Sequence, residues 1–250
     1  KFNTERYSYQ ELATNAIMYT GGIAFAVRAF TEAEATDDYK IYFSTKGKCL
    51  TENLPKMLDI LQAIALESKL DDLDRFRELV SELKTDWDDN FFNRGQTVAI
   101  SRLYSYCSAG ARVNEQDEFS YYQFLKKLTD NFDELAPQVL EQLSLLIKRF
   151  FQKSRFLLSY SCDVKEQATV KAQCLEFISK LSEVEAGEKA ELLPVGTTNE
   201  AIATAGKVQY VAAGGNFAKH GHKYVGAMAV LETILSYEYL WTKIRIQGGA

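Results

Sequence analysis

The segment Ile23–Phe30 reads Ile-Ala-Phe-Ala-Val-Arg-Ala-Phe, and its pattern sets the fold class of the whole chain. Its larger side chains recur at every second residue, which is the period of a strand that packs one face against a core. The segment Tyr39–Ser44 alternates in the same way. An acidic stretch, Thr31–Asp38, separates the two segments. We therefore predict two antiparallel strands joined by a long loop.

A helix is predicted just before the first strand. Ser8 and Glu11 have the spacing of a capping box, in which each side chain accepts a hydrogen bond from the backbone N–H of the other residue. The apolar residues Leu12, Ala16 and Ile17 follow at helical spacing, and we expect the helix to end at Thr20-Gly21-Gly22.

The middle of the chain is predicted to be helical. One helix is expected from about Asn53 to Ala65, and a second from Leu73 to Ser108, which at about 36 residues is about 54 Å long. Gly95 within the second predicts a kink or a close packing contact. Its apolar stripe, Leu73 to Tyr106, is also compatible with a coiled coil or with an exposed helical interaction face, but its aromatic residues fit an intramolecular core better.

Further elements are expected from the remaining periodicity. We predict a loop at Ala109–Gln116, a helix with its stripe at Phe119, Tyr122, Leu125 and Leu128, and a helix with Pro137 in its first turn and its stripe at Leu140, Leu143, Ile147 and Phe150. A third strand is predicted at Arg155–Ser161. It is followed by a helix that begins at Asp163 and Glu166 and buries Val170, Cys174, Phe177 and Leu181.

The last part of the chain is predicted to start a second domain. Periodicity is lost between Ser182 and Glu200, where Pro194 and Gly196 indicate a linker. A strand at Lys207–Ala213 and a helix at His222–Trp241 are expected next, the helix burying Tyr224, Met228, Leu231 and Leu235. The predicted fold is α+β, a mostly antiparallel sheet covered by helices with a long helical middle section. Its domains are residues 1–183, a linker at 184–200, and the start of a second α+β domain at 201–250.

Composition excludes several classes of function. A net charge of -5 and a pI near 5.3, with no clustered basic patch, argue against a nucleic-acid partner. No stretch approaches the roughly 18 apolar residues of a membrane span, so no membrane partner is expected. The four cysteines (Cys49, Cys107, Cys162 and Cys174) lack metal-type spacing, which predicts reduced thiols and the cytoplasm or another reducing compartment.

The residues offer no complete catalytic or metal site. His220 and His222, the two histidines, could supply two ligands to a metal, but no Cys or Glu stands nearby at ligand spacing for a third. We therefore expect a turn there and no metal in this chain. No Gly-x-Ser-x-Gly nucleophile turn and no phosphate-binding Gly-rich loop with its lysine occurs.

The C-terminal segment Tyr239–Ala250 reads Tyr-Leu-Trp-Thr-Lys-Ile-Arg-Ile-Gln-Gly-Gly-Ala. It is predicted to be the end of an amphipathic helix, with Trp241 and Arg245 four residues apart on one face and a Gly pair able to adopt a left-handed cap. An arginine in a last turn often serves the helix dipole, and that interpretation stays open for Arg245.

The same segment closely resembles Leu-Trp-x-x-Ile-Arg-x-x-Gly-Gly-Ala-Tyr-Gly of the presequence-protease and falcilysin-like enzymes in the pitrilysin/insulinase family of metallopeptidases. The segments Tyr7–Leu12 and Tyr19–Ile23 resemble the opening of that family's third domain. Lys207–Val211 and Gly214–Asn216 resemble the start of its fourth. The chain ends just before the position of the family's tyrosine, so we expect it to be an excised piece of a longer protein.

The resemblance implies a function for the parent protein. Enzymes of this family are clamshells whose first half carries the zinc motif His-x-x-Glu-His, which is absent here. By resemblance, the chain is a substrate-binding, zinc-free C-terminal part of a zinc metalloendopeptidase that degrades oligopeptides, inactive by itself and partnered by the N-terminal catalytic half of the same polypeptide. Arg245 would contact the substrate carbonyl. The alternative is a catalytically inactive scaffold or partner subunit of the same fold.

Overall fold

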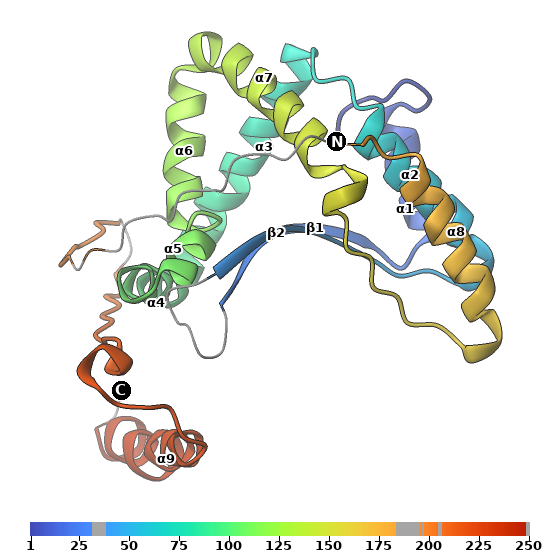
Figure 1. The fold of residues 1–250 in the computed structure, drawn as a ribbon. Helices are drawn as coiled ribbons and strands as arrows, with labels where there is room; N and C mark the ends of the chain where they lie inside the picture. The colour runs from blue at the N-terminus through green and yellow to red at the C-terminus, as the bar shows by residue number, and fades with distance from the viewer. Residues whose placement is uncertain (32–38, 184–195, 197, 205–206, 249–250) are drawn as a thin grey trace. The chain divides into compact units, whose positions relative to one another are not determined.

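A computed structural model describes the chain except residues 32–38, 184–195, 197, 205–206 and 249–250. The chain divides into two compact units, Lys1–Ala212 and Ala213–Ala250. The first unit holds a two-stranded sheet and most of the helices (Figure 1). The α+β fold class predicted from the sequence is confirmed, in a helix-rich form.

The sheet consists of β1 (Ile23–Thr31) and β2 (Tyr39–Gly47), which pair antiparallel as predicted. Val27 lies opposite Phe43 in the register. The rings of Phe150 and Phe151 lie against the Phe43 ring at centroid distances of 5.2 and 5.9 Å. These aromatic contacts fasten the end of a distant helix to the sheet.

Three helices lie side by side in the first unit, as Figure 1 shows. They are α1 (Tyr9–Tyr19), α2 (Leu54–Leu66) and α8 (Gln167–Ser179). The predicted capping box of α1 is present in full, since the Ser8 side chain accepts from the Glu11 N–H and the Glu11 carboxylate accepts from the Ser8 N–H. The predicted inward stripe of α8 is also confirmed, and its Val170 and Cys174 pack with α2.

The larger core is built from α3 (Leu73–Phe91), α6 (Phe119–Asp130) and α7 (Phe132–Phe150). Its buried side chains are Phe76, Val80, Leu125, Leu128, Phe132, Ala136 and Leu140. The aromatic stripe of α3 thus packs inside the unit, as expected for an intramolecular core. Leu128 is 1% exposed and Ala136 is 0% exposed, so the contact between α6 and α7 is tightly closed.

The single long helix predicted from Leu73 to Ser108 is wrong, although the expected break at Gly95 is confirmed. The chain forms α3, a short 3-10 turn at Phe92–Arg94, and then α4 (Gly95–Cys107). A Cβ atom on Gly95 would lie 2.5 Å from Cδ2 of Tyr210. Glycine therefore permits the close approach of that ring at the point where the helix is interrupted.

Two other helix predictions need correction. The loop expected at Ala109–Gln116 is the helix α5 (Ala109–Glu115), because the Ser108 hydroxyl caps it by accepting from the Ala111 N–H. α7 begins at Phe132, so Pro137 lies inside the helix and not in its first turn. Acidic residues in the first turn of α7 favour this earlier start.

The strands predicted at Arg155–Ser161 and Lys207–Ala213 are also wrong. The described residues of both segments have no regular strand structure, and Leu157 is exposed. Alternation of side chains is not enough to make a strand, because the backbone groups also need a neighbouring strand to bond. Most of the predicted linker at 184–200 lies outside the described residues, and the proposed domain boundaries stay a prediction.

A buried ionic cluster, which we call the Arg102 cluster (Arg102, Tyr106, Glu115, Ser120 and Glu200), joins three helices to a distant segment. Glu115, at the end of α5, is 0% exposed. Its carboxylate accepts from the Ser120 N–H at 3.1 Å and the Ser120 hydroxyl at 2.8 Å, both in the first turn of α6. The guanidinium of Arg102, on α4, lies 3.0 Å from the same carboxylate. The buried charge of Glu115 is thereby paired and hydrogen-bonded.

The other side of the guanidinium holds Glu200. The Arg102 Nε and Nη2 atoms donate to the two Glu200 carboxylate oxygens at 2.6 and 3.0 Å, a bidentate pair. This hydrogen bonding lowers the pKa of Glu200 from its ordinary value of 4.5. Arg102 also donates to the Tyr106 hydroxyl at 3.1 Å. One arginine thus fixes α4, α5 and the segment that contains Glu200.

The core predicts a clear stability difference between two leucines. Leu128→Ala should lower the free energy of unfolding by about 2–5 kcal/mol, because it removes a buried side chain and leaves a cavity. Leu175→Ala, at a leucine that is 55% exposed on α8, should change it by less than about 0.5 kcal/mol. Urea denaturation measures both, and equal losses would contradict the assigned core.

Removing the arginine of the Arg102 cluster should be more damaging than removing an exposed ion pair. Arg102→Met should cost about 3–5 kcal/mol, since it leaves the fully buried Glu115 carboxylate without its cation. Glu82→Gln breaks an exposed pair with Lys1 and should cost about 1 kcal/mol or less. Chemical denaturation of the two variants checks the order, and a harmless Arg102→Met would show that Glu115 is solvated.

The lowered pKa of Glu200 predicts a pH dependence. A carboxyl group whose pKa is lower in the folded state contributes stability above its ordinary pKa of 4.5, and this contribution is lost as the pH falls through the folded value. In Glu200→Gln the free energy of unfolding should therefore fall less steeply below pH 4.5 than in the parent. Denaturation curves from about pH 3 to about pH 7 measure the slopes, and identical slopes would refute the pairing.

Candidate functional site

The second unit, Ala213–Ala250, carries the residue that the sequence singles out. It contains a 3-10 turn at Phe217–His220, the helix α9 (Ala227–Ile234), and a continuation at Leu235–Gln247 with the wider hydrogen bonding of a π-helix. The predicted helix start at His222 is wrong, because regular helix begins at Ala227. π-Helical turns are rare and occur often at functional sites.

Arg245 lies in the last turn of this π-helical segment, as predicted. Its guanidinium carbon is 5.7 Å from the centroid of the Trp241 ring, four residues earlier. An arginine in that position is attracted to the ring face, which restricts its side chain to one side of the helix. Trp241 is 54% exposed, so the pair stands at the surface.

The inward stripe predicted for this helix is not buried. Tyr224, Leu231 and Leu235 are all exposed, and no residue of α9 or of the π-helical segment is buried. A single helix and a short turn have too little apolar surface to enclose a core. Gly248 has a φ of -83° and is not left-handed, so the predicted left-handed cap is absent there. Gly249 lies outside the described residues.

The two histidines lie in an exposed turn. His220 ends the 3-10 turn, Gly221 has a φ of +83°, and His222 follows with an exposed side chain. Among the residues that the structure describes, no three side chains of His, Cys, Asp or Glu are grouped so that they could hold a metal ion. The donor set described here therefore does not fit zinc. That the chain binds no metal stays a prediction.

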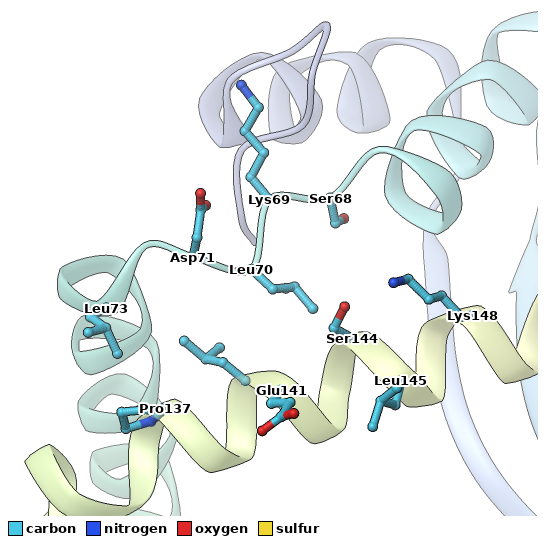
Figure 2. A pocket seen from close by; sticks show the side chains of 11 residues that line it. Ser68, Lys69, Leu70, Asp71, Leu73, Pro137, Glu141, Ser144, Leu145 and Lys148 are labelled. Carbon is cyan, nitrogen blue, oxygen red and sulfur yellow. The ribbon is translucent and has the colours of Figure 1, made fainter.

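A surface groove of about 660 Å³ lies in the first unit between α7 and the connection from α2 to α3. Figure 2 shows Leu70 reaching from that connection toward Ser144 on α7, while the Lys148 ammonium extends along the helix toward Ser144. The carboxylates of Asp71 and Glu141 also line the groove but turn away from the gap between Leu70 and Ser144 (Figure 2). The groove therefore combines apolar walls with two donors on one helix face.

Sequence reasoning missed this groove. Ser144 and Lys148 are four residues apart, which places them on one side of α7, but their position opposite Leu70 depends on how the α2–α3 connection folds. The cysteines are free thiols in the structure. Within the described ranges, no helix is both long and apolar enough to cross a bilayer.

Comparison with known proteins shows similarity over the whole chain. Protein HypA of Clostridium perfringens is 30% identical over 251 aligned residues, covering 100% of this chain and 26% of HypA. Presequence protease 1, chloroplastic/mitochondrial, of Arabidopsis thaliana is 23% identical, covering 82% of this chain and 19% of that protein. The mitochondrial presequence protease of Saccharomyces cerevisiae is 24% identical, covering 99% and 26%. The chain thus spans about a quarter or less of each relative's length.

A family model also matches. The model describes the region associated with peptidases of metallopeptidase family 16, subfamily C, and it covers residues 1–128, just over half of the 250-residue chain. The resemblance to presequence proteases that the sequence motifs indicated is confirmed by the model and by the relatives. The matched residues include the sheet, α3, α4 and α5, together with most of α6. This chain belongs to the peptidase-associated family of metallopeptidase family 16, subfamily C.

Proposed function

We propose that this chain is the zinc-free, substrate-binding part of a zinc metalloendopeptidase that degrades oligopeptides. The observation that carries this proposal is the family match over residues 1–128. Two of the similar proteins are named presequence proteases, and each is several times longer than this chain. The catalytic residues would therefore lie in the N-terminal half of the same polypeptide, and this chain would hold the substrate.

Arg245 is proposed to contact the bound peptide. Its guanidinium lies beside the exposed Trp241 ring at the end of an exposed helix. A planar guanidinium offers several N–H donors in fixed directions, which suits a backbone carbonyl oxygen. Such a donor stabilises negative charge that develops on the carbonyl oxygen during attack on the peptide bond.

Zinc, when bound by the proposed catalytic half, would supply the polarising charge and the activated water. The described residues of this chain bring together no group fit to hold it. The contribution of this chain is accordingly the positioning of the peptide. By itself the chain is proposed to be inactive.

A second proposal, a catalytically silent scaffold of the same fold, differs in what it requires of Arg245. The arginine would then serve only the negative end of its helix, where a cation is favourable. The two proposals are separated by an effect on turnover that a helix-capping residue would not cause.

Arg245→Ala in the full-length protein should lower kcat/KM for oligopeptides by about tenfold to a hundredfold, since hydrogen bonds from charged donors contribute about 1.5–3 kcal/mol. Zinc content, measured by atomic absorption, should not change. Arg245→Lys keeps the charge without the planar fork and should recover only part of the activity. Steady-state cleavage of a quenched-fluorescence peptide provides the measurement.

Lys243→Ala is the matched control, because Lys243 lies two residues away on the same helix and donates to Gln247 within that helix. Its kcat/KM should stay within about twofold of the parent. If Arg245→Ala leaves turnover intact while both variants retain the parent's melting temperature, Arg245 only caps its helix. The scaffold alternative would then be favoured.

A further inference from the structure

We propose that the groove between α7 and the α2–α3 connection binds the free C-terminal carboxylate of an oligopeptide whose last residue is apolar. The inference rests on the proposed function, in that it names which end of the substrate this chain would hold. All residues that line the groove belong to the first unit, whereas Arg245 belongs to the second.

The polar part of the groove consists of two donors. The Ser144 hydroxyl and the Lys148 ammonium lie one turn apart on α7, and Figure 2 shows both beside the gap that Leu70 enters. Within the described part of the chain, no hydrogen bond or ion pair occupies either group. Arg77, by contrast, is paired with Asp133. A hydroxyl and an ammonium left open together match a carboxylate.

The apolar part of the groove fits the side chain next to that carboxylate. Leu70 and Leu73 from the connection and the start of α3, with Pro137 and Leu140 from α7, line it. Leu140 is buried and belongs to the main core, so this wall is rigid. Leu73 is 45% exposed, which leaves apolar surface for a ligand to cover.

The charges around the groove favour an anion over a cation at the Ser144 end. The carboxylates of Asp71 and Glu141 point away from Ser144, and Lys69 also extends away from the groove (Figure 2). The positive charge of Lys148 therefore dominates beside the Ser144 hydroxyl. A volume of about 660 Å³ lies in the range of small-ligand sites and accommodates a terminal residue and its neighbour.

The test uses the full-length protein and matched pairs of quenched-fluorescence peptides that end in leucine, as the free acid or as the carboxamide. For the parent, the KM of the acid should be about tenfold lower than that of the amide, the size of a charge-assisted contact. Lys148→Met should bring this ratio close to one and leave kcat for the amide unchanged. Ser144→Ala should reduce the ratio, and Lys148→Arg should restore it.

Lys127→Met is the matched control, because Lys127 is an exposed lysine in the last turn of α6 and lines no part of the groove. It should keep the parental acid-to-amide ratio. A parent with equal KM values for acid and amide would overturn the proposal, as would a folded Lys148→Met variant that keeps the preference.

Fluorescence anisotropy with the same peptides, labelled at the N-terminus, separates this proposal from the proposed peptidase function. Binding of the acid that depends on Lys148, without cleavage, would support the groove and overturn the peptidase function. Cleavage without any preference for the acid would overturn the groove and support the function. Absence of both binding and cleavage would overturn both.

Discussion

The fully buried carboxylate of Glu115 is the constraint on which the arrangement of the first unit depends. A charge without access to water must be paired and hydrogen-bonded, and here Arg102 and Ser120 do both. Because these residues come from α4, α5 and α6, the three helices can pack in few other ways. The second side of the Arg102 guanidinium holds Glu200, so a segment that follows the large helical core is fixed by the same group.

Local features of the fold could be predicted from the sequence, and long-range ones could not. The alternation in Ile23–Phe30 and the Ser8 capping box identify a strand and a helix start from neighbouring residues alone, and both are present. The strand predicted at Arg155–Ser161 failed because the described residues there pair with no strand, which the segment's own alternation does not reveal. The helix α5 was missed because its stability comes from the Ser108 cap and from the distant partners of Glu115.

The candidate site divides in the same way. Arg245 could be singled out because its neighbours along the chain carry a family motif, and the structure places it beside Trp241 on one helix face as the spacing requires. The groove could not be found from sequence, since Ser144 and Lys148 gain a partner surface only when Leu70 folds against α7. The burial predicted for the C-terminal helix failed for a related reason. An amphipathic pattern shows which face could be covered, and burial also requires something to cover it.

These observations support our proposal of a chain that grips a peptide and leaves the breaking of its bonds to another part of the polypeptide. Photo-crosslinking tests this most directly: an oligopeptide carrying a benzophenone group is bound to the full-length protein and irradiated, and the attachment sites are mapped by mass spectrometry. Direct contact with substrate predicts attachment within Trp241–Gln247, at the helix end that carries Arg245. Attachment confined to parts of the protein outside residues 1–250 would contradict it.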